Sequence, residues 1–268
     1  MGLKVLLATR GELCKGALKI KRCKKVLYIE GIRILGLVKR IHWQSTSDEE
    51  KEAIKEWIKA DEVRIHELEN VPSIPRREYQ RRVKNVGEGR FVYLSRIHPK
   101  KNLLNAIKYF HAVTDKVVFD IYGPIEDKEY WNQCMEEIGK LPDNVIVTYR
   151  GLVDHDYVHE VFSQYDAFLF PTFSENYGHV IAESLIVGTP VIISDQTPWN
   201  GIRKAGAGWA VPLTEREKFV AAINTVIGYS KTDADDVYHK VISFINNKFN
   251  YMGLKKQYES ALSQVIQQ

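Results

Sequence analysis

The feature that most constrains the fold of this chain is an alternation of two patterns along its sequence. Short apolar runs bounded by turn residues alternate with segments in which apolar residues recur at the helical period. This alternation is typical of βα units that build a parallel sheet, so it predicts an α/β fold. Eight strands are expected, at residues 4–8, 41–44, 63–68, 91–95, 117–122, 145–149, 167–170 and 191–194. Helices are expected at residues 17–39, 48–59, 103–113, 127–139, 157–164 and 177–187, with three more toward the C-terminus.

A change of composition divides the chain. Residues 70–90 contain Pro72, Pro75, Gly87 and Gly89 with many basic residues and little apolar periodicity, which predicts a linker. We therefore expect a partial N-terminal α/β segment at residues 1–70, a larger domain at residues 71–250 and a C-terminal helix at residues 251–268. Only three of the expected strands precede the linker, half of the roughly six in a doubly wound domain.

Composition excludes several classes of protein. With 44% hydrophobic and 27% charged residues, the chain has enough apolar material for a packed core and is not expected to be disordered. Its longest uncharged run, residues 184–194, is broken by Gly188 and Pro190 and is too short to span a membrane, and the start lacks the layout of a secretory signal. Cys14, Cys23 and Cys134 are odd in number without C-x-x-C spacing, so we expect reduced thiols in a cytoplasmic protein.

The charge is unevenly distributed. Residues 1–40 hold eleven Lys and Arg against two acidic residues, whereas the whole chain carries a formal net charge of +4. A basic segment of this kind suits an anionic partner, although a solvated helix face accounts for it equally well. Nucleic acid is not expected, because no stacking motif, zinc finger or Gly-x-x-Gly clamp accompanies the charge. An anionic membrane surface, met through residues 15–40 at the inner face, is the expected partner.

The segment FLFPTFSENYGHVIAE, residues 168–183, places a strand, a short polar loop and a helix in succession. In open α/β sheets, ligands lie outside the carboxyl ends of the strands, where a helix start offers free backbone N–H groups to an anion. Gly178 at this helix start would let a phosphate approach those groups closely. The sequence therefore predicts an anion site here.

Two carboxylates flank that helix start. Glu175 precedes the helix, and Glu183 lies four residues after His179, on the same helix face. Because a carboxylate accepts two hydroxyls at once, the pair suits a sugar. The structural alternative is that Glu175 favours the helix dipole and Glu183 is a solvated helix residue.

A second strand-to-helix junction is rich in cations. In LSRIHPKKNLL, residues 94–104, Arg96, Lys100 and Lys101 precede a helix start, where the dipole disfavours positive charge. A bound anion would relieve this conflict, and a diphosphate fits because arginine binds phosphate in a bidentate manner and lysine as a point charge. Lysines on a surface loop are the structural alternative.

Other motifs carry less information. The acidic triplets at Asp154–Asp156 and Asp233–Asp235 resemble metal-binding DxD motifs, but both precede helical patterns, so N-capping explains them better and no metal site is expected. His155 and His159 share a face but lack the Glu of H-E-x-x-H and a third ligand. Absence of Walker A, G-x-G-x-x-G and G-x-S-x-G sequences argues against a kinase, a dehydrogenase and the usual hydrolase.

Taken together, Arg96, Lys101, Glu175 and Glu183 resemble the signature of the retaining GT-B glycosyltransferases of family 4. In that family an Arg and a Lys five positions later follow the first strand of the C-terminal domain, and an E-x7-E pair comes later in the chain, as here. Residues 121–124, 150–153, 165–167, 171–183 and 188–191 add to the resemblance, which is strong over residues 90–213. It implies a Rossmann-like doubly wound parallel sheet that binds a nucleotide sugar.

The resemblance also implies roles for single residues. Arg96 and Lys101 would bind the donor diphosphate and Glu175 the sugar hydroxyls, and these three form the expected catalytic set. Glu183 would bind the ribose. The donor site would be completed by Asn176, by the N–H groups of Tyr177, Gly178 and His179, and by Gly151 and Leu152 against the base. The implied chemistry is retaining transfer without a cofactor or an obligatory metal.

The first seventy residues resemble only the last part of the family's acceptor domain. Two functions are therefore expected as alternatives. One is a glycosyltransferase that moves a sugar from a nucleotide sugar, preferably a UDP-sugar, to a cell-surface polysaccharide or glycolipid. The other is a nucleotide-sugar-binding subunit that becomes active only with a separate N-terminal partner. Because its edge strands would lack neighbours, the first segment is also expected to self-associate as a homo-oligomer.

Overall fold

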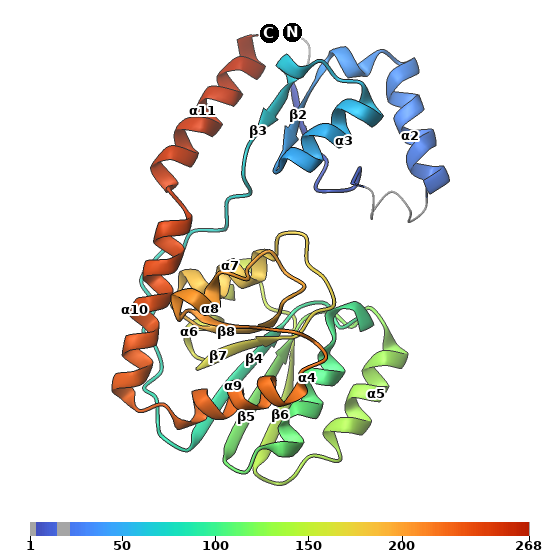
Figure 1. Ribbon diagram of the computed structural model, residues 1–268. Coiled ribbons are helices and arrows are strands. Elements are labelled where there is room, and N and C mark those ends of the chain that lie inside the picture. The colour runs from blue at the N-terminus through green and yellow to red at the C-terminus, as the bar shows by residue number, and fades with distance from the viewer. Residues whose placement is uncertain (1–3, 15–21, 268) are drawn as a thin grey trace. The chain divides into compact units, whose positions relative to one another are not determined.

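The structure is a computed structural model that describes residues 4–14 and 22–267. It divides into two compact units (Figure 1). One comprises the chain up to Val71 together with Phe249–Gln268, and the other is Pro72–Lys248. None of the helices in the described ranges is both long and apolar enough to cross a membrane.

The second unit is built on a six-stranded, all-parallel sheet. Its strands are β4 (Glu88–Leu94), β5 (Lys116–Tyr122), β6 (Val145–Gly151), β7 (Ala167–Phe170), β8 (Val191–Ser194) and β9 (Gly208–Val211). They lie in the order β6-β5-β4-β7-β8-β9, which is the doubly wound order of a Rossmann-like fold. The α/β class and the parallel sheet predicted from the sequence are confirmed. The strand order reverses between β4 and β7, and this switch point is where such sheets bind ligands.

Helices cover both faces of this sheet (Figure 1). On one face lie α4 (Leu103–Tyr109), α5 (Lys128–Ile138) and α9 (Arg216–Gly228). On the other lie α6 (Val158–Ser163), α7 (His179–Ile186), α8 (Ile202–Ala205) and α10 (Lys231–Lys248). The strands β7 and β8 are buried along their whole length, as near-continuous apolar runs are between two helical layers.

The core of the second unit is aromatic near its centre. The Phe110 ring, at the end of α4, lies 5.7 Å from the ring of Phe91 on β4 and 4.9 Å from that of Phe119 on β5, centroid to centroid. All three side chains are fully buried. Burial of side chains this large anchors α4, and hence the loop that precedes it, to the sheet.

Residues 72–87, which the composition predicts to be part of a linker at residues 70–90, belong to the second unit and pack on its other elements. Their arginines form ion pairs with acidic residues far along the chain, and Lys84 is buried and donates to the backbone carbonyls of Glu88 and Ile227. The ion pairs are Arg76–Asp156, Arg77–Glu160, Arg81–Asp235 and Arg82–Asp166. The linker prediction was wrong for most of this segment because basic residues without apolar periodicity can still be held by distant carboxylates.

The first unit has a smaller parallel sheet in the order β1-β2-β3, formed by β1 (Val5–Ala8), β2 (Ile41–Ser45) and β3 (Ile65–Glu67). The helices α2 (Arg22–Ile34), α3 (Asp48–Ile58) and α11 (Tyr251–Gln267) belong to it. Its core includes Trp43, Ile54 and Ile58. The expected helix over residues 17–39 is shorter: α2 ends at Ile34, Gly36 takes a left-handed φ of 65°, and a 3-10 turn follows at Leu37–Lys39. Residues 15–21 lie outside the described ranges.

The buried carboxylate of Glu50 organises this first unit. Its oxygens accept hydrogen bonds from Gly11 N at 2.6 Å, Thr46 N at 2.8 Å and the Thr9 hydroxyl, so α3 is tied to the loop after β1. Burial alone would raise the pKa of Glu50, but these hydrogen bonds outweigh it and lower the pKa overall. The carboxylate is therefore held in its charged form within the core.

Candidate functional site

The loops that follow β4 and β7 meet at the switch point of the six-stranded sheet. Phe173 N donates to Lys100 O at 3.0 Å, and the Thr172 hydroxyl donates to the same carbonyl at 3.2 Å. Asn102 Nδ2 donates to Pro171 O at 2.7 Å. These bonds hold together the two strand-to-helix junctions that the sequence predicts as anion sites.

An ion pair joins the same two loops. Lys101 Nζ contacts Glu175 Oε1, and each side chain is 12% exposed. The ammonium group also lies 5.6 Å from the centroid of the Phe170 ring. The structure thus brings two residues of the predicted catalytic set into direct contact, with the cation and the carboxylate largely shielded from solvent.

Arg96 lies apart from this pair. Its guanidinium contacts both carboxylate oxygens of Glu126 at 3.1 Å, and the Arg96 side chain is 58% exposed. In the structure, Arg96 and Lys101 thus have different carboxylate partners, Glu126 and Glu175. A surface ion pair of this kind is weak and can be exchanged for another anion.

Glycines allow the loops after β4, β5 and β6 to approach one another. Gly123 has a φ of 134°, and a Cβ there would lie 1.9 Å from Ser95 O. Gly123 N donates to Gly151 O at 2.8 Å. Gly151 has a φ of 78°, and the next residue, Leu152, is 73% exposed. Gly151 and Leu152 thus lie at the carboxyl edge of the sheet, where the family resemblance expects the base.

Gly178 forms the N-cap of α7, with a φ of 78° and no side-chain cap. The first backbone bond of the helix runs from Ile181 N to Gly178 O, so the N–H groups of His179 and Val180 precede the helical ladder. Trp199 Nε1 donates to Tyr177 O at 2.6 Å and fixes the approach to the helix. Asn176 and His179 are exposed, and the ring of His179 lies 4.6 Å from that of Tyr177.

Glu183 is buried on α7, only 8% exposed, and is not the solvated helix residue of the structural alternative. Its Oε1 accepts a hydrogen bond from the Ser73 hydroxyl at 3.2 Å and lies 3.8 Å from His155 Nδ1. Burial raises the pKa of Glu183, while His155 and the Ser73 bond counteract that rise. A buried carboxylate beside a titratable imidazole is a common feature of functional sites.

Sequence reasoning missed Ser73 and Trp199 as residues of this region. Ser73 lies 110 positions before Glu183 in a segment that looked like a linker, and Trp199 lies 22 positions after Tyr177. Neither contact has a local sequence signal, because both depend on how the strands are ordered in the sheet.

The acidic triplets have structural partners. Asp156 is paired with Arg76 at 2.8 Å. Asp233 and Ser230 cap the start of α10 reciprocally: Ser230 N donates to Asp233 Oδ2 at 2.9 Å and Asp233 N donates to Ser230 Oγ at 3.2 Å. In residues 4–14 and 22–267, no three His, Cys, Asp or Glu side chains gather where they could hold a metal ion.

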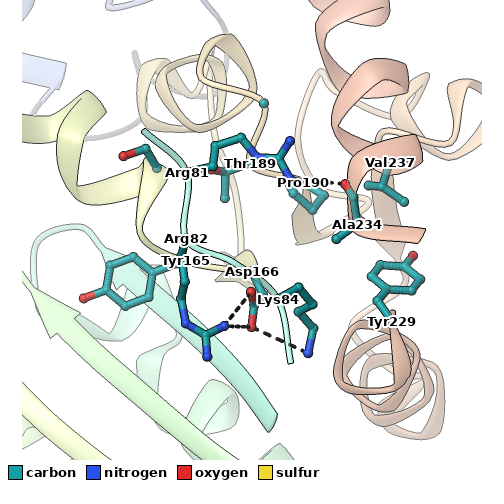
Figure 2. Close-up of a pocket in the computed structure, with 12 residues that line it drawn as sticks. Arg81, Arg82, Lys84, Tyr165, Asp166, Thr189, Pro190, Tyr229, Ala234 and Val237 are labelled. Atoms are coloured by element: carbon teal, nitrogen blue, oxygen red, sulfur yellow. Dashed lines mark hydrogen bonds and ion pairs between the residues drawn. The ribbon is translucent and has the colours of Figure 1, made fainter. Parts of the chain in front are cut away.

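A small cavity lies at the opposite, amino-terminal ends of the strands (Figure 2). It is lined by Arg82 and Lys84 from the segment before β4, by Asp166, which directly precedes β7, and by the turn before β8. Its volume of about 30 Å³ holds about one water molecule. Because ligands of doubly wound sheets bind at the carboxyl ends, we assign this charged cluster to stability.

Comparison with known proteins gives the family. Residues 76–240 match the family described as Glycosyl transferases group 1, and the match spans more than half of the chain. The chain belongs to the glycosyl transferases group 1 family. Among curated proteins, none matches it.

Solved structures of other proteins are similar to this group 1 chain. A mutant of S. aureus TarM in complex with Fondaparinux, alpha-GlcNAc-glycerol and UDP has a TM-score of 0.63 at 14% identity over 82% of this chain and 43% of TarM. HepE from Anabaena, in complex with UDP and glucose, has a TM-score of 0.68 at 15% identity over 96% of this chain and 71% of HepE. Sucrose-phosphate synthase from Thermosynechococcus elongatus has a TM-score of 0.69 at 16% identity over 99% of this chain and 69% of the synthase.

At these identities the likeness shows the fold, which is Rossmann-like and shared with GT-B glycosyltransferases. The chain spans less than half of TarM and about 70% of the other two proteins.

Proposed function

We propose that this chain binds a nucleotide sugar, preferably a UDP-sugar, and serves its transfer with retention to a cell-surface polysaccharide or glycolipid, as in the family 4 enzymes it resembles. The contact between Lys101 and Glu175 carries the proposal, because it joins a cation and a carboxylate at the switch point of a doubly wound sheet. UDP in the TarM and HepE structures supports the choice of donor.

The side chains of the candidate site would have two roles, which are binding of the donor and stabilisation of charge. Lys101 would meet the diphosphate directly, and Arg96 would join it after leaving Glu126. Both would then stabilise the charge that develops on the departing diphosphate. Glu175 would accept hydroxyls of the sugar, and the N–H groups at the start of α7 would bind phosphate oxygens. Gly151 and Leu152 would lie against the base, and Glu183 would bind the ribose.

Binding of the donor is tested with a thermal-shift panel of UDP, GDP, ADP and their sugars. A ligand that binds the folded state raises its stability by mass action, so the preferred nucleotide gives the largest shift. Shifts with none of the nucleotides would contradict the proposal. Transfer is tested with the matching nucleotide sugar and crude glycolipid acceptors, and the configuration of the product reports retention.

A second candidate function is a donor-binding subunit that requires an N-terminal partner. The sheet described for the first unit has three strands, against six in the second, and transfer requires two substrates held in near-attack geometry and shielded from water. Donor binding without turnover, rescued by a complete acceptor-side domain supplied in a chimera, would favour the subunit. Multiple turnovers by the chain alone at the chimera's rate would favour the enzyme.

The helix α2 supports a proposal about the acceptor side. It carries Lys24 and Lys25, and its Leu27 and Ile34 are 76% and 83% exposed. Cationic and apolar groups on one helix favour an anionic lipid surface, consistent with a glycolipid acceptor at the inner membrane face. Co-sedimentation with phosphatidylglycerol vesicles, compared with phosphatidylcholine vesicles, tests this binding.

A further inference from the structure

A chain of three side chains leads from α6 to the carboxylate of Glu183. His159 Nε2 lies 3.4 Å from Ser73 Oγ, and the Ser73 hydroxyl lies 3.2 Å from Glu183 Oε1. His159 is 5% exposed and Glu183 is 8% exposed. Ser73 therefore links two buried polar groups, although it comes from neither the sheet nor a helix.

The direction of these hydrogen bonds follows from the chemistry of the three groups. An ionised carboxylate can only accept, so the single hydroxyl proton of Ser73 points to Glu183. Because the Ser73 proton points to Glu183, the contact between Ser73 Oγ and His159 Nε2 requires the histidine to be the donor. Burial and the nearby His155 lower the pKa of His159, while a hydrogen bond to the Ser73 backbone counteracts that fall. Serine suits this place because one short side chain both donates and accepts.

Both described contacts of the carboxylate fall on one oxygen. Ser73 and His155 approach Oε1, at 3.2 and 3.8 Å. Within the described ranges, no group donates a hydrogen bond to Oε2. An arrangement of this kind holds the carboxylate in one rotamer and leaves one oxygen to accept from a ligand.

We infer that Ser73 is a positioning residue for the donor: its hydroxyl, supported by His159, orients the Glu183 carboxylate toward the ribose hydroxyls. This inference rests on the proposed function, which assigns the ribose to Glu183. It adds a specificity-determining residue from the segment before the sheet, outside residues 90–213, over which the family resemblance is strong.

The competing explanation is that Ser73 has a purely structural role, in which its hydrogen bond only attaches its own segment to α7. The two explanations differ in what the hydroxyl affects. A purely structural residue affects the stability of the unit and the binding of every nucleotide to the same extent. A positioning residue affects the part of the affinity that depends on the ribose hydroxyls, and the pH at which Glu183 loses its charge.

The test compares wild type, Ser73→Ala, Ser73→Thr and Glu183→Gln by calorimetry. The probes are the tightest binder among UDP, GDP and ADP and its 2′,3′-dideoxy counterpart, which lacks both ribose hydroxyls. Ser243→Ala, an exposed position on α10, makes the same chemical change away from the site and is the matched control. Each affinity is measured between pH 5 and 8, and thermal unfolding of each variant reports its stability.

We expect Ser73→Ala to weaken binding of the ribose form about 2- to 12-fold, the range for one hydrogen bond, and to leave the dideoxy form unchanged. Glu183→Gln should remove more of the discrimination, and Ser73→Thr should retain it. The groups that face Glu183 are His155 and Ser73, with His159 behind the serine. Loss of the serine bond removes support for the charged carboxylate, so the acid-side fall in affinity should move to higher pH in Ser73→Ala.

Two results would overturn the inference while the proposed function stands. One is a Ser73→Ala variant that retains both the discrimination and the acid-side profile of wild type. The other is an equal loss of affinity for both probes together with a lower melting temperature, which is expected if Ser73 has a purely structural role. Failure of wild type to bind UDP, GDP or ADP would instead reject the proposed function, and the inference with it.

Discussion

Lys101 and Glu175, 74 positions apart in the chain, form an ion pair that bridges the loop after β4 and the loop after β7. The pair occupies the point where the strand order of the sheet reverses. In this contact each group neutralises the charge of the other. A nucleotide sugar would replace this contact with two, since its diphosphate attracts the lysine and its sugar hydroxyls suit the carboxylate.

The two partners of this pair should therefore have separable effects. Lys101→Ala removes the cation, so it should weaken both UDP and UDP-sugar by about 1.5 to 3 kcal/mol, the range for hydrogen bonds to charged groups. Glu175→Gln removes a contact made only to the sugar and frees the lysine, so it should weaken UDP-sugar but not UDP. Calorimetry with both ligands measures this difference. Unchanged affinities in Lys101→Ala would remove the lysine from the diphosphate site.

The protein should bind the nucleotide more tightly when Glu126, the carboxylate that contacts Arg96, is made neutral. Arg96 contacts Glu126 in the structure, and in the proposed function it leaves that carboxylate to reach a diphosphate. Glu126→Gln should therefore tighten UDP binding by about 0.2 to 1 kcal/mol, the size of an exposed ion pair, whereas Arg96→Ala should weaken it. The gain should shrink at high salt, where the competing pair is already screened. Weaker binding in Glu126→Gln would show that Arg96 does not move.

Donor binding should not depend on a divalent metal. Asp156 is held by Arg76, and Asp233 caps α10, so these carboxylates of the two acidic triplets already have partners. Lys101 and Arg96 can supply the positive charge that a metal would otherwise bring to the diphosphate. UDP affinity measured with EDTA should match that measured with Mg²⁺ or Mn²⁺. Binding that EDTA abolishes and Mn²⁺ restores would assign the site to a metal-dependent donor.

The sequence predicted the parts of the fold that follow from local patterns. The sequence predicted two strands with the observed bounds, Ala167–Phe170 and Val191–Ser194. A fully buried strand between two turns has a sequence that is one continuous apolar run. The short β9 and α8 were missed, since four residues are too few to show a period. The stop of α2 at Ile34 depends on the left-handed Gly36, which helical periodicity alone does not reveal.

For the candidate site, the sequence predicted which residue types meet but not how they pair. The E-x7-E spacing and the cations after β4 pointed to one sheet edge. Lys101 pairs with Glu175, and Arg96 pairs with Glu126. Which carboxylate each cation contacts depends on the distances between the side chains in the folded protein, and these distances cannot be obtained from sequence spacing. Ser73 contacts Glu183 across 110 positions, and only the packing of the basic segment on α6 and α7 brings them together.

A buried histidine pair should make the first unit sensitive to acid. His42 on β2 and His66 on β3 are 2% and 8% exposed, and His42 Nδ1 lies 2.8 Å from His66 Nε2. Burial lowers the pKa of both rings, and for His42 the nearby His66, Arg64 and Lys4 lower it further. The folded pair therefore binds protons at lower pH than the unfolded chain, whose histidines titrate near 6.5.

The direction of the pH effect follows from this difference. Above about pH 6.5 neither state binds the protons, and the free energy of unfolding is at its full value. As the pH falls below about 6.5 the unfolded state takes up protons first, so stability decreases by up to about 1.4 kcal/mol per pH unit for each histidine. Thermal unfolding between pH 5 and 8, with the imidazole resonances followed by NMR, measures the effect. His66→Gln should flatten the profile, and the exposed His239→Gln should not. An identical slope in wild type and His66→Gln would show that the pKa of His66 does not differ between the folded and unfolded chain.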